Sequence, residues 1–199
     1  MNRIIAIEGI CCAGKSTLCS NVSNLKGVAV IPEYGTYTTS FPKHAETSSD
    51  MFAAMEFFSA LEEKRTMDRN NLLQKRDAAV VTVLDRSFIT CCAYDYAFTF
   101  GTDLAKCLPE VEAMWHNFRI KMLPEMLVVL GVNEEVFFKR LALRGRKLTP
   151  PLDNWEFNLR FCAYLEASAK KWGVEVVKIR TETLTPNEVM LSFLNILED

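Results

Sequence analysis

The segment that most constrains the fold of this chain runs from Gly9 to Ser16 and reads Gly-Ile-Cys-Cys-Ala-Gly-Lys-Ser. Its spacing matches G-x-x-x-x-G-K-[ST], the loop whose backbone amides cradle phosphate groups. The β-branched run at 4–7 predicts a buried strand before the loop, and residues 16–25 predict a helix after it. An accidental match is the alternative, but a strand and a helix on the correct sides argue against it. The chain is therefore expected to bind a nucleoside triphosphate.

Each polar group of this loop has an expected partner on the triphosphate. The glycines permit a tight turn with converging N–H groups, and the helix that follows adds its positive N-terminal dipole. Lys15 would contact the β- and γ-phosphates, and the hydroxyl of Ser16 would ligate Mg²⁺. The loop residues expected to bind ATP are Gly9, Cys12, Ala13, Gly14, Lys15, Ser16 and Thr17.

Length and composition predict a single domain, 1–199, in the cytoplasm. With 199 residues, of which 49% are hydrophobic, the chain can bury one α/β core. A net charge of −2 gives no field that favours nucleic acid, and no run approaches the roughly 18 apolar residues of a membrane span. The N-terminus enters a strand without a cleavable leader. We therefore expect neither nucleic acid nor a membrane as a partner.

The seven cysteines do not predict disulfides. Two pairs are adjacent in the sequence, Cys11-Cys12 and Cys91-Cys92, and no spacing is typical of a zinc site. The cysteines are interpreted as small core residues. Redox sensitivity of Cys11 or Cys12 is the alternative, because electropositive N–H groups lower the pKa of a thiol.

Alternating strands and helices predict an α/β fold. The expected strands span 3–7, 28–31, 79–84, 126–131 and 174–179. The expected helices span 15–25, 50–65 with a continuation to about 76, 87–98, 103–121, 134–143, 154–171 and 186–197. Short apolar strands between helices are typical of a parallel sheet covered on both faces, here a three-layer P-loop kinase fold with strand order 2-3-1-4-5. A long loop at 35–49 is expected to act as a lid or substrate loop.

Charged residues follow two of the strands at the edge of the sheet where ligands bind. The third strand ends in Asp85-Arg86, which places Asp85 to organise Mg²⁺ and Arg86 beside the phosphates. A buried Asp85–Arg86 ion pair is the alternative interpretation. The second strand ends in Pro32-Glu33, where a carboxylate could take a proton from an attacking hydroxyl or help to hold Mg²⁺. A solvated loop glutamate is the alternative for Glu33.

A basic cluster lies at the end of the fifth expected helix. Arg140 and Arg144 share one helical face, and Gly145 can end the helix and place Arg146 in a loop. Guanidinium groups on a hinged segment suit closure over a transferring phosphoryl group. A basic helix end that complements the helix dipole is the alternative. The segment from about 140 to 154 is therefore expected to form an arginine-rich lid.

Taken in order, these motifs resemble the thymidylate kinase and deoxynucleoside kinase group of P-loop proteins. The resemblance covers most of the chain and rests on Ile7-Glu8-Gly9, Pro32-Glu33, Asp85-Arg86-Ser87, Ala93-Tyr94, the lid arginines and Asp153-Asn154-Trp155-Glu156. It implies that Glu33 corresponds to the catalytic or phosphate-side carboxylate of the deoxynucleoside kinases. It also implies that Arg86 contacts the reactive end of the acceptor and the transferring phosphate.

The same resemblance assigns roles to the arginines near the lid. Arg140 matches an arginine that lies against adenine, and Arg144 and Arg146 match phosphate clamps. The turn that begins at Arg180 matches the segment that borders the adenine in this group.

The acceptor side departs from both kinds of relative. Deoxynucleoside kinases place paired glutamates after the lid arginines and a base-reading glutamine on the helix after the substrate loop. This chain has Lys147-Leu148-Thr149 and Met55-Glu56-Phe57 at those places. Thymidylate kinases carry Ala-Asp-Arg on that helix, whereas this chain has Ala60-Leu61-Glu62 and its arginine only at Arg65. Aromatic residues there could stack a base or belong to the core: Phe57, Phe58 and Tyr94.

These inferences predict a phosphotransferase that uses ATP and Mg²⁺. The acceptor is expected to be a nucleoside or a nucleoside monophosphate; another small alcohol is the second interpretation, and a nucleotide-dependent switch is the third. Against a switch, the chain lacks Asn-Lys-x-Asp and has Arg86 where motor ATPases place a catalytic glutamate. A homodimer is expected by analogy alone. The expected catalytic residues are Lys15, Glu33, Asp85, Arg86, Arg144 and Arg146, and the expected metal ligands are Ser16 and Asp85.

Overall fold

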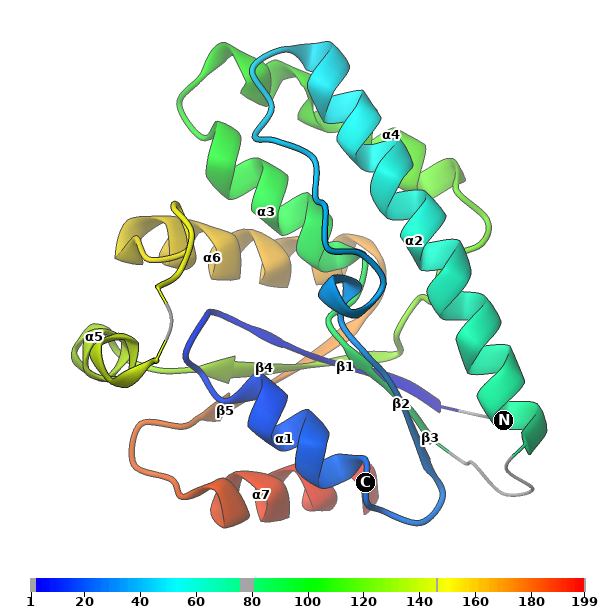
Figure 1. Ribbon diagram of the computed structural model, residues 1–199, viewed down its shortest axis with the longest axis vertical. Coiled ribbons are helices and arrows are strands. Elements are labelled where there is room, and N and C mark those ends of the chain that lie inside the picture. The colour runs from blue at the N-terminus through cyan, green and yellow to red at the C-terminus, as the bar shows by residue number, and fades with distance from the viewer. Residues whose placement is uncertain (1–2, 76–80, 146, 199) are drawn as a thin grey trace.

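The computed structural model describes residues 3–75, 81–145 and 147–198, and this part of the chain is built around one parallel sheet of five strands (Figure 1). The strand order is β2-β3-β1-β4-β5, and every neighbouring pair is parallel. The predicted fold class and strand order are therefore confirmed. The strands are β1 (Arg3–Gly9), β2 (Val28–Ile31), β3 (Val81–Asp85), β4 (Met126–Gly131) and β5 (Glu175–Arg180).

Helices cover both faces of the sheet (Figure 1). On one face, α1 (Lys15–Val22) contacts α7 (Pro186–Glu198). The other helices are α2 (Ser48–Lys75), α3 (Ile89–Thr99), α4 (Leu108–Asn117), α5 (Glu134–Leu143), α6 (Trp155–Lys171) and the 3₁₀ helices η1 (Tyr34–Thr36) and η2 (Asp103–Cys107). On the other face of the sheet, α3 packs along α6, and α2 packs against α4.

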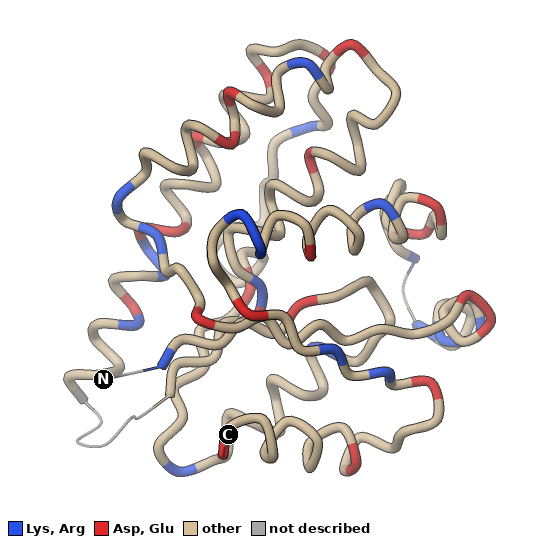
Figure 2. Tube along the Cα trace, turned by 180° about the vertical axis from the view of Figure 1, so that it is seen from behind, with Lys and Arg blue, Asp and Glu red and all other residues tan. Residues whose placement is uncertain are grey.

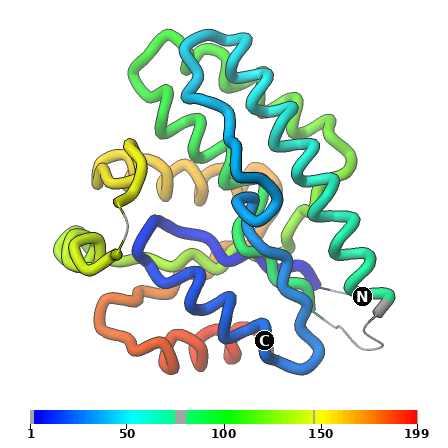
Figure 3. The backbone as a smooth tube through the Cα atoms, in the orientation of Figure 1, coloured from blue at the N-terminus to red at the C-terminus, as the bar shows by residue number. Residues whose placement is uncertain are grey.

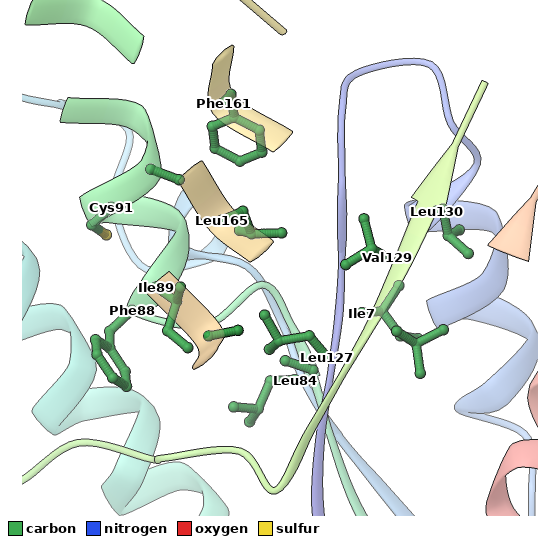
Figure 4. Packing of buried hydrophobic residues seen from close by; sticks show 14 of the residues in the cluster. Ile7, Leu84, Phe88, Ile89, Cys91, Leu127, Val129, Leu130, Phe161 and Leu165 are labelled. Atoms are coloured by element: carbon green, nitrogen blue, oxygen red, sulfur yellow. The ribbon is translucent and has the colours of Figure 1, made fainter. Parts of the chain in front are cut away.

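The core lies between the sheet and the helices on both of its faces (Figure 4). Leu127 and Val129 alternate with their neighbours along β4 and point towards Ile89 of α3 and Leu165 of α6. Ile7 points to the opposite face, where α1 lies. All of these side chains are buried, as expected for strands covered on both faces. This packing fixes the carboxyl ends of β1, β2 and β3, from which the candidate site is built.

Several predicted helices differ from the structure; the helix predicted at 15–25, for example, ends at Val22. The prediction of one helix at 103–121 is wrong, because η2 is followed by a separate helix, α4, which ends at Asn117. Pro109 stands in the first turn of α4, where a missing N–H costs nothing, so it favours a new helix start. The helix predicted from Ser87 begins two residues later, at Ile89. The N–H and the hydroxyl of Ser87 both donate to Glu8, which holds this residue in the turn before α3.

The predicted long loop connects η1 to α2 and runs along the helical layer (Figure 3). It is packed on α3: the ring of His44 stacks on that of Phe98 with centroids 4.8 Å apart, and its Nδ1 lies 3.2 Å from the hydroxyl of Tyr94. Phe57, Phe58 and Tyr94 are half-buried and pack against the core cluster. The role of the loop as a lid or substrate loop stays a prediction.

Charged residues of both signs are interspersed along the chain when it is seen from behind (Figure 2). Within the described residues, no helix is both long enough and apolar enough to cross a membrane. The predicted absence of a nucleic-acid partner stays a prediction.

Candidate active site

The loop between β1 and α1 has the backbone shape that cradles a phosphate. Gly9, Cys12 and Gly14 have φ values of 123°, 62° and 101°, so the chain turns sharply through the left-handed region. Gly14 is the N-cap of α1, and Lys15 is the first residue of that helix. The loop amides and the N-terminus of α1 therefore face the same region of space, where an anion is favoured.

A cleft of about 860 Å³ opens at this loop. Gly9 and Asp85 lie at the ends of β1 and β3 and are not among the described lining residues. Arg180 is not among the described lining residues, and Arg146 lies outside the described residues. The structure thus brings together, around one cleft, the following predicted residues: Cys12, Ala13, Gly14, Lys15, Ser16, Thr17, Glu33, Arg86, Arg140 and Arg144.

Lys15 lies across the phosphate loop. Only 7% of its surface is exposed, and its Nζ donates a hydrogen bond of 2.7 Å to the carbonyl of Ile10. Burial, followed by the positive charge of Arg86, lowers the pKa of Lys15 to about 8. An anion bound in the cleft would raise this pKa again, because it would stabilise the charged form of Lys15.

Glu33 and Arg86 form an ion pair at the carboxyl ends of β2 and β3. Arg86 Nε lies 3.7 Å from Glu33 Oε2, and both side chains line the cleft. Arg86 has a φ of 68°, a left-handed conformation that is uncommon for a residue with a side chain. The cleft therefore presents a carboxylate and a guanidinium side by side, together with residues of the phosphate loop.

Asp85 is the last residue of β3 and is 8% exposed. Burial, and next the negative charge of Glu33, raise the pKa of Asp85. The ion pair that Arg86 makes is with Glu33, so the alternative of an Asp85–Arg86 pair is not what the structure contains. A divalent cation beside Asp85 would relieve the unfavourable proximity of the two carboxylates.

Arg140 ties α5 to the phosphate loop. Its Nη1 donates to the carbonyl of Cys12 at 3.1 Å and to the hydroxyl of Thr181 at 2.9 Å. The Thr181 hydroxyl in turn donates to the carbonyl of Ala13 at 3.0 Å. Arg144, which follows α5, lines the cleft beyond Arg140. The loop is thus braced by Thr181, just after β5, and by Arg140 of α5.

Three residues near the site have roles that the sequence did not predict. Thr181, rather than Arg180, reaches the cleft; Arg180 is exposed and pairs with Glu182 at 2.6 Å. Glu8 is buried and accepts hydrogen bonds from the N–H of Ser87 at 2.7 Å and from its hydroxyl at 2.8 Å. Arg65 is fully buried, so it is not free to meet an acceptor phosphate. Of these three roles, the sequence could have indicated only that of Glu8, because a carboxylate inside an apolar strand needs buried partners.

Gly9 is the position of the loop where a side chain has no room. A Cβ at Gly9 would lie 2.1 Å from the carbonyl oxygen of Leu130 on β4, in addition to the strain of a φ of 123°. We expect Gly9→Ala to lower the free energy of unfolding by about 3 kcal/mol. Urea unfolding followed by circular dichroism measures this loss.

Gly101→Ala is the matched control for that substitution. Gly101 also has a positive φ, 78°, but no described atom lies within 4 Å of an added Cβ. The expected loss there is about 1 kcal/mol, from backbone strain alone. Equal losses at Gly9 and Gly101 would mean that the approach of Leu130 does not constrain the loop.

Two comparisons relate the sequence of this chain to known proteins. A family model described as an AAA domain matches residues 4–184. A probable thymidylate kinase from Archaeoglobus fulgidus is 31% identical over 153 residues, which cover 74% of this chain and 72% of that protein.

Solved structures share the fold at lower identity. Thymidylate kinase from Candida albicans has a TM-score of 0.71 at 18% identity, with 99% of this chain and 91% of that chain covered. Deoxyadenosine kinase from M. mycoides has a TM-score of 0.67 at 16% identity, with 98% of both chains covered. Because the family model matches residues 4–184 and the curated relative is 31% identical over 74% of the chain, this chain belongs to the AAA-domain family and to the thymidylate kinase group of P-loop phosphotransferases.

Proposed function

We propose that this protein transfers the γ-phosphoryl group of ATP to a nucleoside or a nucleoside monophosphate. The observation that carries the proposal is the Glu33–Arg86 ion pair, which lines the same cleft as the phosphate loop. A switch protein needs only the loop, whereas a transferase also needs groups for an acceptor and for the charge that moves to it. The acceptors named for the relatives, thymidylate and deoxyadenosine, support the same choice.

The residues of the loop fit a magnesium nucleotide. Lys15 and the loop amides would hold the β- and γ-phosphates, and Arg140 with the apolar residues Leu184 and Pro186 would border the adenine. Ser16 is exposed at the start of α1 and, with Asp85, offers the oxygen ligands that Mg²⁺ prefers. Bound Mg²⁺ would supply positive charge to the phosphates.

The transferring phosphoryl group needs positive charge on its equatorial oxygens. Arg86 and Arg144 line the cleft and would supply it, and Arg146 is assigned the same role by resemblance. Glu33 would orient the acceptor and, when the acceptor is a hydroxyl, take its proton. Contact of Arg180 with the adenine and a homodimer stay parts of the proposal that rest on resemblance. A lid at about 140–154 and a cytoplasmic location stay parts of the proposal that rest on the sequence alone.

The test is ADP release from Mg·ATP in the presence of a panel of nucleosides and nucleoside monophosphates. The proposal expects at least one of them to accelerate release, with phosphorylated acceptor formed in equal amount. A flat response with slow background hydrolysis would favour another small alcohol as acceptor. A flat response with fast hydrolysis would favour a nucleotide-dependent switch and would overturn the proposal.

Substitution of Glu33 distinguishes a nucleoside acceptor, whose hydroxyl must lose a proton, from a nucleoside monophosphate. With a nucleoside as acceptor, Glu33→Gln is expected to lower kcat by about 10²-fold, because general-base catalysis is lost while the shape is kept. The KM for ATP should change by less than about threefold, since no loop residue is altered.

Glu166→Gln is the control for this change. Glu166 pairs with Lys178 at 2.7 Å outside the cleft, so the loss of its charge should leave kcat unchanged. If Glu33→Gln retained full activity towards a nucleoside, Glu33 would not be the base, and only its pairing with Arg86 would remain as its role.

A further inference from the structure

The side chain of Arg65 hydrogen-bonds to the ends of two strands at once. It is fully buried, although it lies on a helix segment with a charged sequence. Its Nε donates to the carbonyl of Pro32 at 3.1 Å, just after β2. Its Nη2 donates to the carbonyls of Arg86 at 2.7 Å and Asp85 at 3.3 Å, at the end of β3. One planar guanidinium thus joins the segments that follow two neighbouring strands.

These carbonyls belong to the peptide groups that carry the ion pair of the cleft. Pro32 directly precedes Glu33, and the third carbonyl is that of Arg86 itself. The guanidinium of Arg65, together with the pairing of β2 and β3, therefore fixes the distance between the two backbone segments. That distance decides whether the side chains of Glu33 and Arg86 meet, as they do at 3.7 Å.

A hydrogen bond from Arg65 also stabilises the unfavourable backbone conformation of Arg86. Arg86 has a φ of 68°, and such a conformation persists only where its surroundings over-determine it. The N–H of Arg86 donates to the carbonyl of Ile7 at 3.2 Å, and the next N–H, that of Ser87, donates to Glu8 at 2.7 Å. The bond from Arg65 to the Arg86 carbonyl completes the set, so the N–H and the carbonyl of Arg86 and the N–H of Ser87 all have a partner.

The charge of Arg65 is balanced inside the same cluster. Glu62 is also fully buried, and its Oε2 accepts from Arg65 Nη1 at 2.8 Å and from the hydroxyl of Tyr34 at 2.9 Å. Its Oε1 accepts from the N–H of Met122 at 3.1 Å. Burial, followed by the charge of Glu62, raises the pKa of Tyr34, so its hydroxyl stays a donor. A fully satisfied buried ion pair can hold one fixed geometry, which a lysine, as a point charge, cannot copy.

From these contacts we infer that Arg65 is a positioning residue of the reaction: it acts through Arg86 and Glu33, whose spacing and direction it sets, and does not touch the nucleotide or the acceptor. The inference rests on the proposed function for its kinetic consequence. Its structural consequence, the order of the Arg86 side chain, is independent of which acceptor is used.

The experiment compares wild type with Arg65→Lys in the full chain. We expect kcat with the best acceptor to fall 10- to 100-fold, while the dissociation constant of Mg·ATP changes by less than about threefold. In an Arg86→Lys background the same substitution should lower kcat by less than about threefold, because its effect passes through Arg86. Nε–Hε relaxation in the free protein should show that the Arg86 side chain loses order in Arg65→Lys.

The matched control is Arg69→Lys, one turn further along α2. Arg69 Nε donates to the hydroxyl of Thr82 at 3.2 Å, so it braces β3 away from its carboxyl end. We expect kcat and the order of Arg86 to be unchanged in this variant. If Arg65→Lys does not fold, Glu62→Gln replaces it, since loss of the buried charge loosens the Arg65 fork without removing it.

Two results would overturn the inference. One is an Arg86 side chain that stays as ordered in the variant as in wild type. The other is a loss of kcat in the Arg86→Lys background as large as in wild type, which would make Arg65 a brace of the fold alone. Absence of activity with every acceptor would overturn the proposed function instead, while the relaxation measurement would still decide the role of Arg65.

Discussion

Replacement of Lys15 by alanine is expected to lower kcat by about 10³-fold, because the substitution removes the cation that the loop holds closest to the transferring phosphate. Lys15 is buried at the start of α1, and no neighbour in the loop could replace its charge. The backbone of the loop should survive, since Gly9 and Gly14 set its shape. Binding of Mg·ATP should therefore weaken much less than turnover.

The pH dependence of ATP binding is a second property that Lys15→Ala is expected to change. The pKa of Lys15 is lowered to about 8 in the free protein, and bound phosphates would raise it again. Between these two pKa values, binding takes up a proton, so the affinity for Mg·ATP should fall as the pH rises above 8, by up to about tenfold per pH unit. Titration calorimetry from pH 7 to 9.5 measures this slope.

In Lys15→Ala the slope should disappear, and in Lys26→Ala, an exposed residue outside the cleft, it should stay as in wild type. A dissociation constant of wild type that does not change between pH 7 and 9.5 would mean that the ammonium group does not meet the phosphates.

The sequence was sufficient to predict the fold for a clear physical reason. A parallel sheet covered on both faces needs short, continuous apolar strands, and such runs are visible without partners. The bounds predicted for β2, β4 and α5 agree with the structure residue by residue. The end of α4 could not be seen in this way, since Asn117 is followed by residues of ordinary helix composition.

Arg140 and Arg144 were predicted from the basic cluster at the end of a helix, and the rest of the candidate site from residues that follow strands. Lys15, Glu33 and Arg86 stand at the carboxyl ends of β1, β2 and β3 or just beyond them, and parallel strands bring these ends to one edge. Arg65 shows the limit of this reasoning. Its segment, Glu-Glu-Lys-Arg, is typical of an exposed helix face, yet the side chain is buried among carbonyls of two distant strand ends. A partner that is a backbone carbonyl leaves no mark in the sequence.

Arg86→Gln is expected to lower kcat by about 10³-fold, because it removes a guanidinium from the reactive end of the cleft. Arg86→Lys keeps the charge but not the planar fork, so a loss of about 10²-fold is expected. Neither change touches the loop, and the dissociation constant of Mg·ATP at pH 7 should stay within about threefold. Arg3→Gln, at the opposite end of β1, is the control and should leave kcat unchanged.

The effect of Arg86 on Lys15 provides a test that does not depend on the acceptor. The positive charge of Arg86 is, after burial, the largest cause that lowers the pKa of Lys15. Arg86→Gln should therefore raise this pKa, and the pH above which the affinity for Mg·ATP begins to fall should move upward. Arg86→Lys keeps the charge and should leave that pH in place. If the two variants shifted it equally, the guanidinium would not be close enough to Lys15 to act with it on one phosphoryl group.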